Sequence, residues 1–431
     1  MKKILLITFI IILNTNAVYA VTLLDAIKQT FKNNTELNAE RENIKISKED
    51  LKISKADYFP SLTITGTKSK EETNKLTNQG GGDASISDAD PFTTSIKLEQ
   101  TLVDFGRGAE YQKSKIGINL AESKLFKKEQ DILYKAIETF TGLVFARDKL
   151  IINQRNLNLL ERQVETDSLR LETGQITISD LAQSESSLAG ARAQYIQAQN
   201  DVITNKLNYE NIIGGALVID NLEKSLEAIA AIPQSLESAI DLSKTNNPDI
   251  KIAKYELDQT EKDITIAKSD LSPSATLSLE RSYSDDLSST YDEREKDILK
   301  ATVSWPFYSG GSNRAKVNKN QSLKNRKKLL LDNEIKSNQS NVASAWSNLQ
   351  SSESLLTSVR SQVKAAEIAN EGISAEYERG SGRTTLDVIQ SNALLLNAQI
   401  SLASSERNYI LAQYNLLKSI GLLNSSYLKL K

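Results

Sequence analysis

The sequence of 431 residues contains no cysteine and no histidine. Without them the chain lacks the usual ligands of a zinc site, a thiol nucleophile and a histidine general base. It also has no disulfide framework and no cysteine to carry a lipid. The carboxylates are scattered along helical patterns, where they assemble no metal cluster or nucleophile–base pair. We therefore expect a protein that is not an enzyme and that uses no cofactor.

Net charge and proline are also scarce. The 53 basic residues nearly balance the 55 acidic ones, so the sequence gives no reason to expect a nucleic-acid partner. Only six prolines occur, and the surplus of Ser, Asn, Gln, Lys and Ala suits long polar helices better than a compact core. Beyond the N-terminus, no segment is apolar enough over about 20 residues to predict a membrane helix.

The N-terminus has the pattern of a secretory signal. Lys2 and Lys3 precede an apolar run at 4–13, and Val18-Tyr-Ala20 fits a cleavage site with small residues. An uncleaved membrane anchor is the alternative, but the run is short for a membrane span of about 20 residues. We expect cleavage after Ala20 and export.

The rest of the chain is an internal duplication. Leu23-x-x-Ala-Ile recurs as Leu236-x-x-Ala-Ile, and Pro60-Ser recurs as Pro273-Ser, both at an offset of 213 positions (from 23 to 236). We expect a signal peptide at 1–20, a first repeat at 21–212, a linker at 213–234, a second repeat at 235–421 and a tail at 422–431.

Each repeat begins with a helical pattern, near 22–57 and 235–270, which a proline ends. Two segments of alternating apolar and polar residues follow, on either side of a loop rich in Gly, Asp and Ser, at 80–91 and 284–297. Alternation with a period of two indicates β-strands, so each repeat supplies one hairpin of strands of roughly ten residues. The polar positions on these strands are Thr63, Thr65, Lys97, Glu99, Thr276, Ser278 and Lys300.

A helix of about 60 residues follows each strand hairpin, on the order of 90 Å long. Its apolar positions recur every seven residues: Leu150, Leu157, Val164 and Leu171 in the first repeat, and Val342, Leu349, Leu356, Val363, the polar Asn370 and Tyr377 in the second. A period of 3.5 residues predicts that each helix supercoils against a partner. After each tip we expect a second helix that returns, near 178–212 and 385–421.

The two helical hairpins have the same tip. The first helix of each breaks at a glycine, Gly174 or Gly380, and the return helix restarts with a Thr-x-x-Asp capping box at 177–180 and 384–387.

A four-stranded sheet with one apolar and one polar face cannot stand alone in a membrane, because its edges would leave backbone groups unpaired in lipid. It must close with other chains. Two chains give eight strands, a barrel that side chains fill, whereas three give twelve and leave a water-filled lumen. The polar faces favour the wet interior, although a hairpin of a soluble protein also shows this alternation.

This order of elements, twice over, resembles the TolC family of bacterial outer-membrane efflux channels along essentially the whole mature chain. The most specific fragments are Ala56-Asp-Tyr-Phe-Pro-Ser, Gly174-x-x-x-Ile-Ser-Asp-Leu, and Tyr377-x-x-Gly with Arg383-Thr-x-Leu-Asp-Val. The resemblance implies a mainly α chain that forms a homotrimer. Its transmembrane barrel would have twelve strands, four per chain, and continue into a long α-helical coiled-coil barrel.

The resemblance also implies a place and partners. The channel would lie in outer-membrane lipid, extend into the periplasm, and dock a periplasmic adaptor protein and an inner-membrane pump or ABC transporter, as in tripartite efflux or type I secretion. It would be a passive duct without catalytic activity. Because such ducts look alike for drugs, toxins and proteins, the sequence predicts a passage and not a cargo.

Five residues at the tips match the gate of the family's closed state. Ser179 and Asp180 match the acceptor side, Tyr377 and Arg383 match the donors, and Asp387 matches an aspartate that faces the lumen. The sequence departs from the family in two ways: Ser381-Gly makes the second tip one residue longer, and Gln390 replaces a second lumen aspartate of some members. The residues also allow a plainer interpretation, with both aspartates as helix caps and Tyr377 as a packing residue.

Two other classes of function remain open from the residues. A periplasmic adaptor carries a coiled-coil hairpin, but usually one hairpin flanked by β-rich domains, whereas this chain has two hairpins and no such domain. A structural coiled-coil protein without a pore explains the heptads but not the four alternating strands.

Overall fold

A computed structural model describes residues 21–72, 88–215, 222–224, 231–288, 291–380 and 382–430. The predicted signal peptide and its cleavage site lie outside these residues. The chain forms two compact units. One comprises 1–38, 128–246 and 339–431, and the other comprises 39–127 and 247–338. Each unit therefore draws residues from both sequence repeats. No helix in the described ranges is long and apolar enough to cross a membrane.

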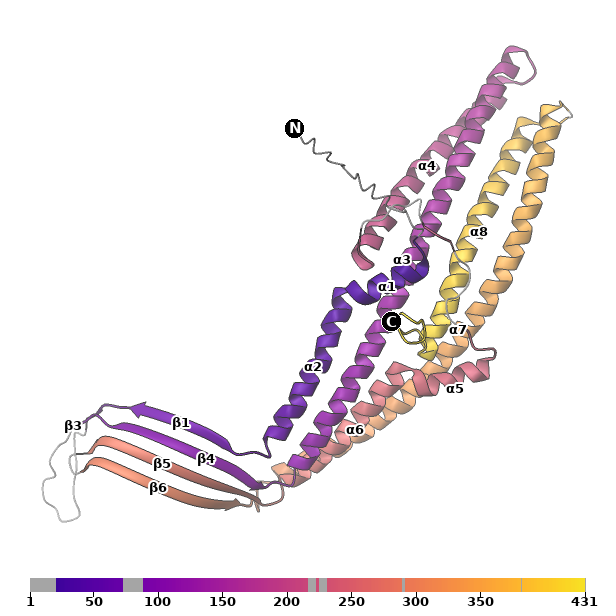
Figure 1. Ribbon diagram of the computed structural model, residues 1–431. Helices are drawn as coiled ribbons and strands as arrows, with labels where there is room; N and C mark the ends of the chain where they lie inside the picture. Colours follow the sequence, from indigo (N-terminus) through magenta and orange to yellow (C-terminus); the bar gives the residue numbers. More distant parts are fainter. Residues whose placement is uncertain are drawn as a thin grey trace, which may run out of the picture. The chain divides into compact units, whose positions relative to one another are not determined.

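The second unit contains a four-stranded antiparallel sheet in the order β1-β4-β5-β6 (Figure 1). Its strands are β1 (Ser61–Lys68), β4 (Phe92–Val103), β5 (Ser274–Ser288) and β6 (Tyr291–Ser304). The two predicted hairpins are confirmed, since β1 pairs with β4 and β5 with β6. Pairing of β4 with β5 joins the hairpins of the two repeats into one sheet.

The register of the sheet separates apolar from polar side chains. Leu62, Leu98, Leu279 and Leu299 are opposite one another and form one row across all four strands. One position along, the row on the other face is Ser61, Glu99, Ser278 and Lys300. The four leucines are 39–72% exposed in the single chain, so the sheet presents an apolar surface that nothing in the described chain covers.

Two loop predictions need correction. The second loop, expected at 284–297, is mostly strand, because β5 and β6 continue their pairing to Ser288 and Tyr291. In the first loop, the two-residue strands β2 (Glu71–Glu72) and β3 (Asp88–Ala89) pair with each other. Residues 80–87 of the predicted first loop lie outside the described residues.

The helix that opens each repeat is two helices rather than one. They are α1 (Leu23–Asn33) with α2 (Thr35–Ala56), and α5 (Leu236–Asn246) with α6 (Pro248–Ser269). At the second break the Asn247 side chain accepts hydrogen bonds from the amides of Asp249 and Ile250, and proline occupies the first position of α6. Asparagine as an N-cap favours this restart over continuation of the first helix.

The long helices are α3 (Arg107–Glu172) and α7 (Ser312–Glu378), and the return helices are α4 (Ile178–Ile212) and α8 (Thr385–Ile420). Figure 1 shows α3 beside α4 and α7 beside α8. In the second hairpin all six predicted heptad positions are buried, whereas in the first only Leu157 is buried, and Leu150, Val164 and Leu171 are partly exposed. Leu157 and Leu160 pack with Ala191, and Val363 and Ala366 pack with Ala398. Each long helix therefore packs against its own return helix.

The first unit has its main core where both hairpins meet α1 and the C-terminal segment. Its residues come from α1, α3, α4, α8 and the chain beyond α8. The segment expected as a tail at 422–431 contributes Leu423, Leu428 and Leu430 to this core. The amide of Ser425 also donates to Glu129 on α3, at 2.5 Å. The C-terminal segment is thus packed against the helices up to residue 430.

Candidate functional site

The two hairpin tips are built alike, and both predicted capping boxes are present. Gly174 and Gly380 end the outgoing helices in the left-handed region, with φ of +71° and +73°, which a glycine adopts without strain. The Thr177 amide donates to Asp180 Oδ2 at 2.9 Å, and the Asp180 amide donates to Thr177 Oγ1 at 3.3 Å. The same reciprocal bonds, at 2.9 and 3.2 Å, start α8 at 384–387.

Capping keeps both tip aspartates ionised. The Thr177 backbone amide and hydroxyl lower the pKa of Asp180 below its ordinary value. The equivalent groups of Thr384 lower the pKa of Asp387. Hydrogen bonds to the charged form of a carboxylate favour that form. Each tip therefore carries a fixed negative charge at its surface under ordinary conditions.

Tyr377, predicted as a gate donor, is buried at the end of α7 and is 5% exposed. Its hydroxyl donates to Asp167 Oδ1 on α3 at 2.7 Å. It also lies 3.0 Å from Thr385 Oγ1, at the start of α8. Burial raises the pKa of the phenol, and the neighbouring Asp167 carboxylate raises it further. Tyr377 therefore stays protonated and remains a donor.

Asp167 is completely buried and is the centre of this polar cluster. Its Oδ1 also accepts from Gln163 Nε2 at 2.9 Å, and its Oδ2 accepts from Ser184 Oγ on α4 at 2.5 Å. Since Tyr377 gives its one proton to Asp167, the Thr385 hydroxyl is the donor between those two residues. A continuous chain of hydrogen bonds thus joins α8, α7, α3 and α4. We call Asp167, Ser184, Tyr377 and Thr385 the four-helix link.

Arg170 supports the link from one turn further along α3. Its guanidinium lies 4.1 Å from the centre of the Tyr377 ring. One of its nitrogens donates to the Tyr377 carbonyl at 3.4 Å. A guanidinium over an aromatic face is an attractive cation–π arrangement. Arg170 therefore holds the ring whose hydroxyl reaches Asp167.

The other predicted gate residues are at the surface of the tips. Arg383 Nε donates to Glu376 in its own hairpin at 2.6 Å, and Ser179 is exposed. Asp180, Tyr377 and Arg383 line one open cavity of about 560 Å³ between the two tips. Within the described residues, no hydrogen bond joins Ser179 or Asp180 to Tyr377 or Arg383. Ser381, which lengthens the second tip, lies outside the described residues.

The sequence contained a signal for Asp167 that the prediction missed. Asp167 falls three residues after Val164 and four before Leu171, which is a core position of the first heptad pattern. A carboxylate at such a position is buried by the supercoil and needs partners. The same reasoning applies to Asn370 in the second hairpin, whose buried side chain donates to Ser391 on α8 at 3.1 Å.

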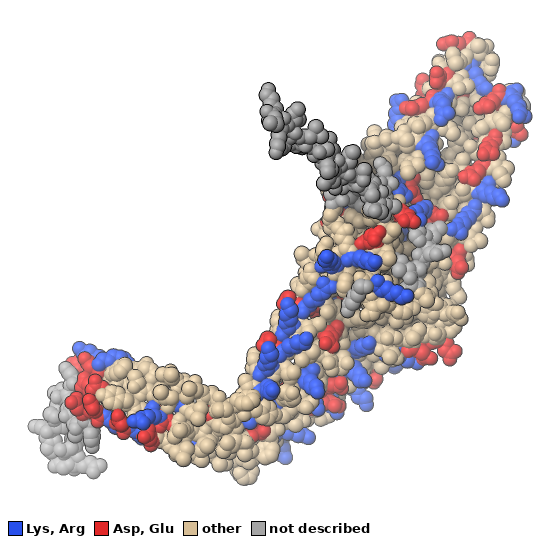
Figure 2. Space-filling view, viewed as in Figure 1, with Lys and Arg blue, Asp and Glu red and all other residues tan. Residues whose placement is uncertain are grey.

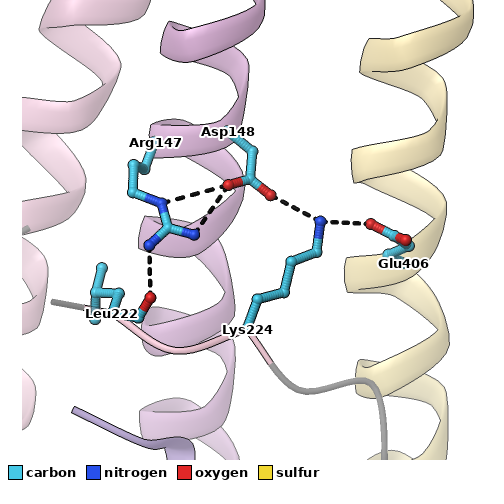
Figure 3. Close-up of polar contacts among 5 residues, drawn as sticks. All are labelled: Arg147, Asp148, Leu222, Lys224 and Glu406. Atoms are coloured by element: carbon cyan, nitrogen blue, oxygen red, sulfur yellow. Dashed lines mark hydrogen bonds and ion pairs between the residues drawn. The ribbon is translucent and has the colours of Figure 1, made fainter. Parts of the chain in front are cut away.

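A second polar cluster ties both hairpins to the segment between the repeats (Figure 3). Lys224 donates to Asp148 Oδ2 on α3 at 2.8 Å and pairs with Glu406 Oε2 on α8 at 2.5 Å. Arg147 donates to the Leu222 carbonyl at 2.6 Å. We call 222–224 the strap, because it connects α3 to α8 through these contacts.

No group of three or more Asp and Glu side chains in the described part of the chain could hold a metal ion. What the tips offer is a set of breakable polar contacts between helices, with paired charges at the surface. Such contacts can hold two helical hairpins together and can release them, but they provide no reacting group. The arrangement therefore fits a gate or a docking surface.

Comparison with known proteins identifies the family. The family model of the outer membrane efflux protein matches residues 26–215 and 239–422, most of both repeats. The chain belongs to the outer membrane efflux protein family. This result confirms the resemblance and places the protein in the bacterial outer membrane as an efflux channel, rather than as a periplasmic adaptor or a coiled coil without a pore.

Individual relatives are similar in sequence to this efflux protein over nearly the whole chain. Outer membrane efflux protein BepC of Brucella suis biovar 1 is 26% identical, over 97% of this chain and 90% of BepC. Alkaline protease secretion protein AprF of Pseudomonas aeruginosa is 21% identical, over 98% of this chain and 89% of AprF. The Campylobacter jejuni CmeC outer membrane channel has the same fold, with a TM-score of 0.79, 15% identity and coverage of 93% of this chain and 85% of CmeC.

Proposed function

We propose that three copies of this efflux protein form a passive duct through the outer membrane and periplasm, and that the duct opens at the helical tips. The observation that carries the proposal is the two-faced sheet. Its apolar face includes a row of four exposed leucines, and its polar face has hydroxyl and charged side chains. A sheet with these faces suits a barrel wall with lipid on one side and water on the other.

The edges of the sheet support assembly from several copies. Strands β1 and β6 have no neighbour beyond them among the described residues. In lipid, each unpaired backbone group at such an edge costs several kcal/mol. Joining β6 of one copy to β1 of the next removes both edges, and three copies then form a barrel of twelve strands, wide enough for a wet lumen.

The helical hairpins support the same assembly. Ile196 and Ile203 on α4 are seven residues apart and are 57% and 58% exposed. A second apolar seam at heptad spacing, on the face of α4 that its own hairpin leaves open, is what a neighbouring copy would cover. The hairpins of three copies would then surround one helical tunnel that continues the barrel.

The gate of this duct is made of the tip residues. The four-helix link holds the two hairpins of each chain together, while Ser179, Asp180 and Arg383 remain at the surface, where a neighbouring copy can reach them. Hydrogen bonds that involve a charged group contribute about 1.5–3 kcal/mol each. In a ring of three chains each contact occurs three times, so the closed state is stable until a partner separates the tips.

The partners follow from this design. The tips face the periplasm, where an adaptor protein would dock and connect the duct to an inner-membrane pump or ABC transporter. AprF is a protease secretion protein and BepC is an efflux protein, so relatives of this chain include both kinds of system. The duct supplies the passage, and the pump supplies the energy and selects the cargo.

Conductance measurements test the gate. The double variant Tyr377→Phe with Arg383→Ser should raise the resting conductance of the purified protein in planar bilayers. Tyr195→Phe, on the shaft of α4, is the matched control and should leave it unchanged. If the double variant assembles normally and conducts like the wild type, the tip residues only pack and cap, and the gate lies elsewhere.

A further inference from the structure

The two faces of strand β6 carry opposite charge at the end furthest from the helices. The sequence there alternates in sign over Glu293-Arg-Glu-Lys-Asp. Because successive side chains of a strand point to opposite faces, the three carboxylates share one face, and Arg294 and Lys296 share the other. A strand with both signs mixed on each face would have no such polarity.

Contacts on both faces support this assignment. Arg281 on β5 is paired with Asp297 in the register, and its guanidinium contacts Glu295 at 3.3 Å and Asp297 at 3.8 Å. Arg281 and Asp297 lie on the face of the leucine row, two positions beyond Leu279 and Leu299, and Glu295 lies two positions beyond Asp297 on the same face. On the polar face, Thr93 Oγ1 lies 3.1 Å from Ser284 Oγ, and Ser284 is the register partner of Arg294.

The register partners of the two cations on the polar face are neutral. In the register, Arg294 follows Thr67, Thr93 and Ser284 across the sheet, and Lys296 follows Thr65, Ser95 and Ser282. The carboxylate nearest in sequence on this face is Asp292, at the start of β6. No ion pair of Arg294 or Lys296 occurs within the described residues.

Closer to the helices, the charges of the polar face cancel. Lys97 forms an ion pair with Glu99 and is the register partner of Glu280. With Lys300, this section of the polar face has two cations and two carboxylates. On the polar face, each chain therefore has a balanced middle section and one net positive charge among Asp292, Arg294 and Lys296. The leucine face at the same end carries Arg281 against the carboxylates of Asp285, Glu293, Glu295 and Asp297. Figure 2 shows charged side chains gathered at that end of the sheet, beside a largely uncharged surface.

We propose that Arg294 and Lys296 form a basic ring at the outer end of the lumen, which favours anions and opposes the acidic Asp387 at the inner mouth. The proposal rests on the proposed function, because it takes the polar face of the sheet as the lumen wall. Three chains contribute six cations against three Asp292 carboxylates. Rings of Arg and Lys select anions in pores, as rings of acidic side chains select cations.

A duct with fixed charge of opposite sign at its two ends has a further property. Under one sign of voltage both cations and anions accumulate inside it, and under the other sign both are depleted. Current through the open duct should therefore rectify, and anionic cargo should meet an attractive potential as it leaves. The effect depends on screening, so it should be clear at 0.1 M salt, with a Debye length of about 10 Å, and weak at 1 M, with about 3 Å.

Reversal potentials in a salt gradient test the basic ring. Relative to wild type, Arg294→Gln with Lys296→Gln should shift the reversal potential toward cation selectivity and bring the ratio of currents at opposite voltages close to one. Asp387→Asn alone should make the duct anion-selective, and adding the two glutamines should remove that selectivity. Glu293→Gln with Glu295→Gln, on the other face, is the matched control and should change neither quantity.

A thiol test reports on the ring without removing its charges. The chain has no cysteine, so Ser282→Cys, next to Lys296, introduces a single thiol. It should react several-fold faster with a negatively charged thiosulfonate than with a positively charged one at 0.1 M salt. Equal rates, or unchanged selectivity in the double glutamine variant, would overturn the basic ring. If the wild-type protein formed no channel at all, the proposed function itself would fail.

Discussion

Asp167 and Tyr377 are 210 positions apart in the sequence, and their contact connects the two hairpins at the scale of single atoms. The Asp167 carboxylate is completely buried and accepts hydrogen bonds from three side chains on three helices. A buried charge is tolerated only when such partners satisfy it. The carboxylate therefore specifies how α3, α4 and α7 must be placed, whereas Asp180 satisfies its charge within its own helix cap.

A double-mutant cycle can separate these two aspartates. Asp167→Asn should lower stability by about 1.5–3 kcal/mol, the usual contribution of hydrogen bonds to a charged group. Combined with Tyr377→Phe, its effects on thermal unfolding in detergent and on resting conductance should be clearly non-additive, because the two side chains touch. Asp180→Asn with Tyr377→Phe is the control cycle and should be additive. Additivity in the first cycle would show that the four-helix link has no energetic coupling.

Asp387 should give the inner mouth its preference for cations. Three copies of the carboxylate would surround the axis of the assembled duct, and rings of acidic side chains attract cations. Asp387→Asn should remove most of the block by multivalent cations added on the inner side, and leave assembly intact, since asparagine still accepts a capping bond. Loss of the hairpin fold with block unaltered would identify Asp387 as a cap alone.

The pKa of Asp387 sets the pH range of this block. Hydrogen bonds from Thr384 place it below the ordinary aspartate value of 3.8. A group with a lowered folded-state pKa stays charged, and keeps its stabilising bonds, at every pH above the unfolded value, and loses both as pH falls through the folded value. Block should therefore be the same at pH 7 and pH 5, and decline only below about pH 4. A decline already at pH 6 would point to a different group.

At the scale of elements, the strap decides how α3 and α8 are held together in the first unit. Lys224 is 34% exposed, while its partners Asp148 and Glu406 are 17% and 12% exposed. Burial lowers the pKa of Lys224, but the hydrogen bonds to Asp148 and Glu406 outweigh it, so the net shift is upward and the amine stays charged. The linker between the repeats thus acts as a tie between both hairpins.

Lys224→Met should lower the stability of the purified protein by about 1–3 kcal/mol, between the values for exposed and buried ion pairs. The loss leaves Glu406 without its cation, so Lys224→Met with Glu406→Leu should recover part of it. Lys206→Met, which removes an exposed pair with Glu210 at 3.9 Å, is the control and should cost under about 0.5 kcal/mol. Thermal unfolding in detergent measures all three, and equal losses for Lys224 and Lys206 would show that the strap is not a tie.

At the scale of the whole molecule, one chain supplies four strands with two open edges and cannot close a barrel. We expect the mature protein to be extracted from membranes as a trimer that requires detergent. Native mass measurement or light scattering on the purified protein gives the stoichiometry. A stable monomer in aqueous buffer would contradict the duct, and a dimer would contradict the twelve-stranded barrel.

The sequence alone determined most of the local architecture. Strand alternation gave the two faces of the sheet, heptads gave the helical hairpins, and Thr-x-x-Asp boxes gave the tips at 177–180 and 384–387. These features depend on interactions between residues within about seven positions of one another, so they can be predicted from a short stretch of sequence. The repeat made each pattern visible twice, which is why even weak strand signals could be interpreted.

Only the tertiary structure decided which distant residues meet. The heptads indicate that Asp167 and Tyr377 are buried, but they do not show that these two residues contact each other. The sequence around Lys224 and Glu406 likewise does not identify the partner of either residue. The packing of the C-terminal segment likewise depends on the core that surrounds it. Contacts of this kind depend on how whole helices pack. Burying a polar group costs free energy unless packing brings hydrogen-bond partners to it.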